Sequence, residues 1–120
     1  MQEVQERLLT VVNQIKEKYP LYGRRAYFFI YEVVGFTGKK LQLSDKQHIT
    51  AENFLKGFRD LTKESFGPMA MDVLKSWNVQ NCEDIGRIVS HFVEFNVLRK
   101  ESSDSFDDFT RYQFDFNQVF

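Results

Sequence analysis

The sequence predicts a single, mainly helical domain of about five helices that ends in a small C-terminal β-hairpin. Five segments repeat apolar residues at steps of three and four, which is the period of an amphipathic helix. Two short strand-like runs, 97–101 and 111–116, then flank a turn at Ser102-Ser103. Three successive helices followed by a hairpin are typical of a winged-helix-like unit. We therefore divide the 120 residues into an N-terminal helical pair (1–36), a basic loop (37–47), a winged-helix-like unit (48–116) and a C-terminal tail (117–120).

The first two helices are expected in the N-terminal third. The first carries one apolar stripe, formed by Val4, Leu8, Val11, Val12, Ile15 and Tyr19. Pro20 ends this helix because the residue before a proline is driven out of the helical region. The second helix is expected over 24–34, where apolar residues leave little polar face, so it should lie centrally. Gly35 can end it in the left-handed conformation, and the basic stretch around Lys39 and Lys40 indicates a loop.

Three further helices are separated by strong breaks. Thr50 is a good N-cap for the third helix, which runs up to the Gly67-Pro68 break. A proline at a first helical position is well tolerated, so the chain can restart there as the fourth helix. Asn81 is placed to cap the fifth helix, in which Gly86 indicates close packing against another backbone.

Beyond the fifth helix the pattern changes to that of two β-strands. Asn96 is expected to end the helix in the left-handed conformation. Over 111–116 aromatic side chains alternate with polar ones, which places the aromatic rings on one face of a sheet. The segment 102–110 would form the tip of the hairpin, with Phe106 and Phe109 holding it against the domain.

Several segments of the chain together carry a family resemblance. They are His48-Ile49-Thr50, Phe66-Gly67-Pro68-Met69-Ala70, Val73-Leu74 with Trp77, Glu83-Asp84-Ile85-Gly86 with Ile88-Val89, and Asp104, Asp107-Asp108-Phe109 and Tyr112 with Phe114-Asp115-Phe116. On these residues, and over nearly its whole length, the chain resembles an uncharacterised family of small conserved hypothetical bacterial proteins. Family members usually carry glycine where this chain has Asn78 and Asn96, and asparagine is the next-best residue at positive φ. The resemblance implies a helical, winged-helix-like fold and no established activity.

Composition and cysteine content narrow the class of protein. With 42% hydrophobic and 16% aromatic residues, the chain has enough apolar surface to fold around a core. No apolar run reaches the ~18 residues needed to span a bilayer, and the polar first residues differ from a secretory signal. The single cysteine, Cys82, allows no internal disulfide, which fits a reducing compartment. We therefore expect a cytoplasmic protein that does not contact a membrane.

The net charge of −1 hides a difference between two parts of the chain. Residues 81–116 hold four basic and eight acidic side chains, a net charge of −4, whereas residues 1–80 carry +3. A nucleic-acid-binding winged helix needs basic residues on its last helix and wing, because phosphate neutralisation supplies most of the affinity. The acidic part therefore disfavours nucleic-acid binding, and the charge difference could instead steer self-association.

Few residues are candidates for catalysis or metal binding. Cys82, His48 and His91 are the soft ligands or nucleophiles, and they lack the paired spacing that zinc sites use. The acidic stretch 104–108 lacks the spacing of an EF-hand, and its aspartates more simply cap a turn. Because no catalytic constellation is apparent, we expect no enzyme activity, no cofactor and no metal.

Two surfaces are candidates for binding a partner. The aromatic surface consists of Phe106, Phe109, Tyr112 and Phe114, and could bind another protein or a second copy of the chain. The basic surface consists of Lys39, Lys40, Lys56, Arg59 and Lys63, with aromatic residues nearby that could stack single-stranded bases. Core packing of the rings and solvation of the helix faces are the simpler explanations of each feature taken alone. A non-enzymatic protein-interaction domain is our first prediction, and a nucleic-acid-binding regulator that uses the basic surface of residues 24–63 is the alternative.

Overall fold

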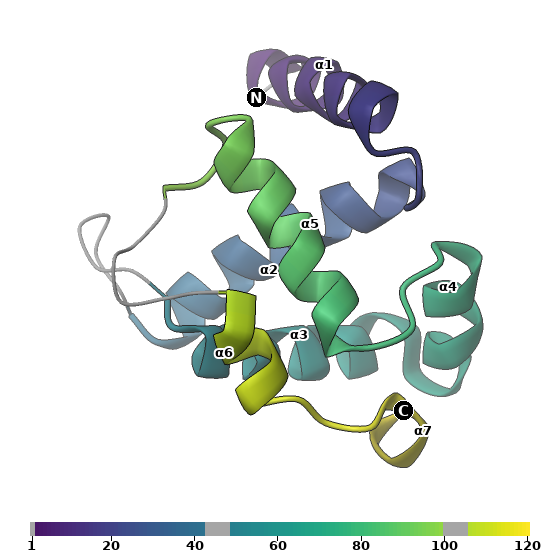
Figure 1. The fold of residues 1–120 in the computed structure, drawn as a ribbon. Helices are drawn as coiled ribbons and strands as arrows, with labels where there is room; N and C mark the ends of the chain where they lie inside the picture. The colour runs from purple at the N-terminus through teal and green to yellow at the C-terminus, as the bar shows by residue number, and fades with distance from the viewer. Residues whose placement is uncertain (1, 43–48, 100–105) are drawn as a thin grey trace.

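Helices make up all the regular secondary structure in residues 2–42, 49–99 and 106–120, which are the residues that this computed structural model describes. Figure 1 shows α1 at one edge of the molecule, α5 crossing in front of α2, and α6 and α7 at the opposite edge. The elements are α1 (Gln2–Lys18), α2 (Arg24–Lys40), α3 (Ala51–Phe66), the single 3-10 turn η1 (Gly67–Met69), α4 (Ala70–Ser76), α5 (Cys82–Glu94), α6 (Phe106–Arg111) and α7 (Phe116–Val119). The prediction of a mainly helical fold is confirmed.

Helix α1 ends where the sequence predicts, just before Pro20. Val12 and Ile15 of its apolar stripe are fully excluded from solvent. The turn that follows is tied to the end of α4, because the Gly23 amide donates to the Trp77 carbonyl oxygen at 3.2 Å. The start of α2 is therefore connected to α1 through the turn and to the end of α4 through this hydrogen bond.

Helix α2 continues to Lys40, so the predicted stop at Gly35 and the predicted loop from residue 37 are wrong. The reason is tertiary packing: Thr37 is 2% exposed and faces α3. Burial of this turn against α3 outweighs the helix-weakening effect of the glycines within it, which is about 1 kcal/mol each. The rest of the predicted loop, 43–48, lies outside the described residues.

Helices α2 and α3 approach each other closely at Gly57. A Cβ atom at this position would lie 1.9 Å from the hydroxyl oxygen of Thr37 and 3.0 Å from its Cβ. A glycine is therefore required for this crossing, and no larger side chain fits without moving a helix. Thr50 caps α3 as predicted, with its hydroxyl oxygen accepting from the Asn53 amide at 3.2 Å.

The connections around α4 and α5 use residues that tolerate positive φ. Gly67 has a φ of 50°, and Asn78 and Asn96 have φ values of 64° and 62°. Asn81 caps α5 in a reciprocal capping box with Asp84. The predicted stop at Asn96 and the predicted cap at Asn81 are both confirmed.

The predicted C-terminal β-hairpin is wrong. Residues 97–98 of the first expected strand form a bend and residue 99 is irregular. Residues 100–105, which include the expected Ser102-Ser103 turn, lie outside the described residues. The second expected strand is divided among the end of α6, an irregular link and the start of α7. Because the described part of the chain contains no strand, the winged-helix-like arrangement of residues 48–116 is not supported.

Local capping explains why this part of the chain forms short helices. Two aspartates lie in the first turn of α6, where negative charge complements the helix dipole. Asp115 caps α7, because its carboxylate accepts from the Asn117 amide at 2.9 Å. The rings of Phe114 and Phe116 do share one side, with centroids 5.6 Å apart. A bend followed by a helical turn thus gives the same alternation that indicated a strand.

The core lies between α2, α3 and α5 and includes the fully buried rings of Tyr27, Phe58 and Phe92. Gly86 of α5 is buried, as the prediction of close packing requires, and α6 packs along this helix. Within the described ranges, each helix is too short or too polar to cross a membrane.

Candidate functional site

The fold separates the members of the aromatic surface. Phe109 is 7% exposed and its ring meets that of Phe54 in α3 edge-on, with centroids 6.1 Å apart. Tyr112 is 41% exposed, and Phe114 is partly buried. Phe106 is the first residue of α6, and its side chain is not among those described. Phe109 therefore belongs to the core, whereas Tyr112 and Phe114 reach the surface.

The end of the chain forms an aromatic clasp, which we define as Phe114, Phe116 and Phe120 packed around Phe58 of α3. The Phe58 ring lies 5.8 Å from the Phe116 centroid and 5.9 Å from the Phe120 centroid. Phe114 and Phe120 close the group with centroids 6.0 Å apart. Stacked and edge-on aromatic pairs of this kind stabilise by about 1 kcal/mol each beyond the area that they bury.

The clasp also covers Cys82. Its Sγ accepts from the Phe114 amide at 3.5 Å, and the cysteine has no exposed surface. Burial raises the pKa of the Cys82 thiol. Because the thiolate is the reactive form, this cysteine is a poor nucleophile while the clasp is in place.

Ion pairs neutralise part of the basic surface. Lys40 at the end of α2 pairs with Asp60 of α3, and this hydrogen bond lowers the pKa of the Asp60 carboxyl. Arg59 lies 3.1 Å from the same carboxylate, and Lys56 lies 3.4 Å from Glu52. Exposed pairs like these contribute little stability, but they reduce the positive potential that a polyanion would meet.

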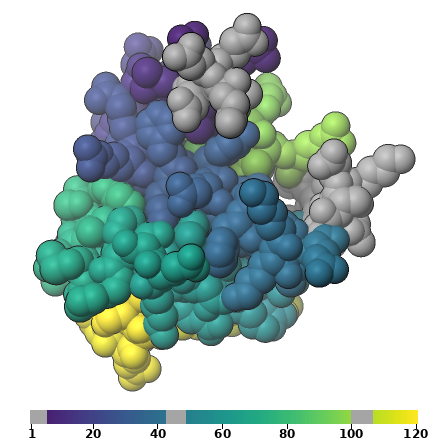
Figure 2. All heavy atoms as spheres, turned by 180° about the vertical axis from the view of Figure 1, so that it is seen from behind, coloured from purple at the N-terminus to yellow at the C-terminus, as the bar shows by residue number. Residues whose placement is uncertain are grey.

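The remaining two basic residues are less constrained. Lys39 near the end of α2 and Lys63 near the end of α3 are exposed, and neither has an ion pair within the described ranges. Figure 2 shows the face to which these helices contribute, formed by α2 and by the α3–α4 segment. Each phosphate contact adds to the affinity and salt dependence of nucleic-acid binding, so two unpaired lysines make a weak footprint.

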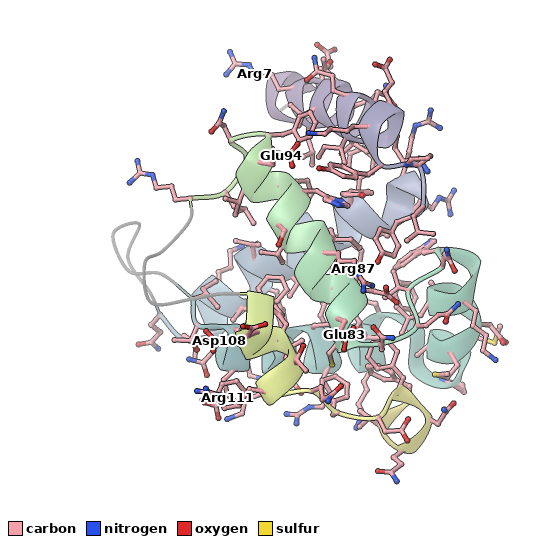
Figure 3. The ribbon with its side chains drawn as sticks, viewed as in Figure 1. Arg7, Glu83, Arg87, Glu94, Asp108 and Arg111 are labelled. Atoms are coloured by element: carbon pink, nitrogen blue, oxygen red, sulfur yellow. The ribbon has the colours of Figure 1, made fainter. Side chains whose placement is uncertain are left out.

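A polar constellation that we did not predict runs along α5. Asp84, Arg87, His91 and Glu94 follow at steps of three and four, so they share one face of the helix, and we call them the polar row. Figure 3 shows Arg87 and Glu94 on α5, with Glu94 at the end nearer to α1. The side chains that meet the row from the N-terminal part of the chain are Lys18, Tyr19, Tyr22 and Tyr27.

Asp84 anchors the first end of the polar row. It is 7% exposed, and its Oδ1 accepts from the Tyr22 hydroxyl at 2.5 Å and from Arg87 Nη1 at 2.9 Å. Its Oδ2 accepts from the amides of Gln80 and Asn81 at 2.8 and 3.3 Å. Burial and the hydrogen bond to Asp84 raise the pKa of Tyr22 to about 12. These bonds join the α1–α2 turn to the start of α5.

His91 joins the other end of α5 to both N-terminal helices. Its ring stacks on that of Tyr19, with centroids 4.0 Å apart and planes 6° from parallel. Its Nδ1 lies 2.8 Å from the hydroxyl oxygen of Tyr27, which is fully buried. Glu94 accepts from the Tyr19 hydroxyl at 2.7 Å and from Lys18 Nζ at 2.6 Å.

Burial and charge explain the pKa shifts around His91. Burial lowers the pKa of His91 from its usual 6.5; Glu94 opposes this shift, while Arg87 and Lys18 add to it. The Lys18 hydrogen bond lowers the pKa of Glu94, and Glu94 in turn raises the pKa of Lys18. Burial also raises the pKa of Tyr27. His91 is therefore neutral at physiological pH, in contact with a neutral tyrosine hydroxyl.

The structure does not bring the predicted nucleophile and base candidates together. Cys82 begins α5, and His91 lies about 13 Å further along the helix axis. The Cys82 thiol faces Phe114, and His48 lies outside the described residues. The contacts of the polar row join helices to one another, so the row can hold α1 and α2 against α5 and can respond to protons through His91.

Comparison with known proteins adds no relative. No protein-family model matches the chain, and no match is found among curated proteins or among solved structures. The resemblance to an uncharacterised bacterial family therefore stays a prediction.

Proposed function

We propose that this protein is a non-enzymatic, cytoplasmic interaction domain that binds a protein partner through Tyr112 and the exposed parts of the aromatic clasp. The supporting observation is the incomplete burial of these rings. All three rings lie in the last turns of the chain. Tyr112 is 41% exposed, and Phe114 and Phe120 are partly buried. Aromatic residues are enriched at interfaces because they add large contact area while few rotatable bonds are immobilised.

The charges beside these rings indicate the chemistry of the partner. Within the described residues 106–120, the acidic side chains of Asp107, Asp108 and Asp115 outnumber the single basic side chain of Arg111. A partner with an apolar patch and a basic rim would fit this surface. A second copy can provide the basic rim with its unpaired lysines on α2 and α3, and such a contact would be head-to-tail.

The first test is the oligomeric state of the purified protein over a wide concentration range, measured by sedimentation velocity. The wild type should gain mass with concentration, or should retain a defined protein partner when purified from its native cells at low salt. Tyr112→Ala should weaken either association. Tyr31→Ala is the matched control, because Tyr31 on α2 is 37% exposed and lies outside the clasp.

Two outcomes would count against this proposal. A monomer that retains no protein, or an association that Tyr112→Ala leaves unchanged, would remove the role of the C-terminal rings. Co-purified nucleic acid that is lost at higher salt, and in a Lys39→Glu, Lys63→Glu double variant, would instead favour a nucleic-acid-binding regulator.

A further inference from the structure

The end of α1 meets α5 through contacts that centre on His91. Tyr19, the first residue after α1, lies flat against the His91 ring, and both Tyr19 and Lys18 donate to Glu94 one turn further along α5. Figure 1 shows α1 at the edge of the molecule, far from α6 and α7. Loss of the Tyr19–His91 stack would therefore loosen the end of α1.

The hydrogen bond to Tyr27 depends on the protonation state of His91. The Tyr27 hydroxyl is fully buried, and the described residues offer it no second partner. The Tyr27 hydroxyl proton has a hydrogen-bond acceptor only when Nδ1 of a neutral His91 accepts it. The proton of the neutral imidazole then lies on Nε2. An imidazolium carries a proton on Nδ1 and cannot accept, so the buried hydroxyl loses its acceptor.

The charges around the His91 ring also act on an added proton. Arg87 lies one turn before His91 on α5 and Lys18 faces it from α1, so two cations flank the ring. Glu94 is the opposing anion, but it is already bound to Lys18 and to the Tyr19 hydroxyl. The other titratable groups that face the ring are Tyr19 of the α1–α2 turn at 4.0 Å, Tyr27 of α2 at 6.0 Å and Tyr22 of the α1–α2 turn at 6.4 Å between centroids. Attraction of the cation to the Tyr19 ring, and donation from the protonated Nδ1 to the Tyr27 oxygen, oppose release but leave the Tyr27 hydroxyl proton without an acceptor.

We propose that His91 is a proton-operated latch, in which uptake of a solvent proton by Nδ1 leaves the Tyr27 hydroxyl proton without an acceptor, displaces the ring from Tyr27 and Tyr19, and so releases the end of α1 from α5. Because α1 also packs against α2, release from α5 loosens the end of α1 and makes its apolar stripe more accessible. The stripe includes Val12 and Ile15, both fully buried in the closed state.

The direction of the pH effect follows from linkage. The pKa of His91 is lower in the closed state than its usual 6.5, so the closed state binds fewer protons than the open state. The closed state is fully stabilised above about pH 6.5 and loses this stabilisation as the pH falls from there to the closed-state pKa. Because one proton is involved, the equilibrium constant for opening rises at most about tenfold per pH unit in this window.

Glu94 affects the stability of the closed state over a different pH range. Its lowered pKa places the loss of its contribution below its usual value of 4.5. A transition just below pH 6.5 can therefore be assigned to a histidine, and the chain has only His48 and His91.

The experiment is amide hydrogen exchange of α1 in the full chain between about pH 7 and about pH 5, corrected for intrinsic exchange rates. We expect protection of α1 to fall by up to about tenfold per pH unit in the wild type and in His48→Gln, the matched control. Protection in His91→Gln should change little, because glutamine does not titrate. Equal pH dependence in wild type and His91→Gln, or constant protection in the wild type, would overturn the proposal.

A second measurement covers the case in which His91→Gln does not fold. The His91 ring is titrated by NMR in the wild type and in Tyr27→Phe, which removes the hydroxyl and keeps the ring. We expect a wild-type midpoint below 6.5 that coincides with the opening of α1, and a higher midpoint in Tyr27→Phe. A wild-type midpoint at or above 6.5, or one that Tyr27→Phe leaves unchanged, would contradict the latch.

Discussion

The crossing of α2 and α3 provides the sharpest test of the fold. We expect Gly57→Ala to destabilise the protein, because the new Cβ would lie 1.9 Å from the Thr37 hydroxyl oxygen and 3.0 Å from Thr37 Cβ. Rotation of the Thr37 side chain can relieve the first contact but not the second, so the helices must separate. Overpacking of this kind costs about 1–3 kcal/mol and occasionally more. The better helix propensity of alanine returns about 1 kcal/mol, which leaves a net loss of about 1 kcal/mol.

A second glycine supplies the matched control. Gly35 also lies inside a helix, but no atom lies within 4 Å of the position that its Cβ would take. Gly35→Ala should therefore stabilise the protein by about 1 kcal/mol, through helix propensity and the lower entropy of the unfolded chain. The two substitutions are chemically identical, so opposite signs would isolate the helix crossing as the cause.

Thr37 allows the cause to be assigned to one contact. Its hydroxyl is buried and finds no hydrogen-bond partner among the described residues, so Thr37→Ala alone should be close to neutral. Combined with Gly57→Ala, it removes the 1.9 Å contact but keeps the 3.0 Å contact, so it should recover part of the lost stability, a coupling typical of residues in contact.

The assay is urea unfolding followed by the fluorescence of Trp77, the only tryptophan, whose ring packs against Phe29 and Phe66. If Gly57→Ala is as stable as the wild type, or gains as much as Gly35→Ala, then α2 and α3 do not approach at Gly57. Close packing of the two helices at this position would then be refuted.

Three further predictions concern α5, the clasp and the buried tyrosines. Asn81→Ala should cost about 1 kcal/mol, since it removes the side chain that accepts from the Asp84 amide at 3.0 Å. Asn117→Ala is its control in urea unfolding, because among the described residues the Asn117 bond to Asp115 is made by the backbone amide, which alanine keeps. Phe116→Leu should weaken the clasp by about 1 kcal/mol and speed the reaction of Cys82 with a thiol reagent about fivefold, whereas Tyr112→Ala should leave that rate unchanged. An unchanged rate in Phe116→Leu would mean that the clasp does not control access to Cys82. In a spectrophotometric alkaline titration, Tyr22 and Tyr27 should ionise above the usual tyrosine value of 10, Tyr22 with a pKa of about 12, and Tyr22→Phe should remove part of this late change. The absence of any late change would show that neither ring is buried as described.

Local signals in the sequence determined the first five helices and most of their ends. Pro20, Thr50, Asn81 and Asn96 act on the backbone within a few residues, through a missing amide, a cap or a tolerated positive φ. Such effects do not depend on the rest of the fold, and each of these predictions is confirmed.

Tertiary structure decided where α2 ends and what the C-terminal segment becomes. Gly35 is a good stop by itself, but the burial of Thr37 against α3 extends the helix to Lys40. In the C-terminal segment, alternating rings match a strand as well as a bend that leads into a helical turn. The choice depends on the position of Phe58, around which the clasp assembles.

The polar row was also predictable from the sequence only in part. Its spacing on α5 was visible in the sequence, since Asp84, Arg87, His91 and Glu94 follow the helical period. Nothing local indicated that tyrosines from the N-terminal helices would meet it, because those residues are more than sixty positions away in the chain. The first five helices and the caps of α3 and α5 follow from the sequence alone, because they rest on interactions between near neighbours. Only the folded structure decided the partners of His91, because packing of helices distant in the chain sets which side chains meet.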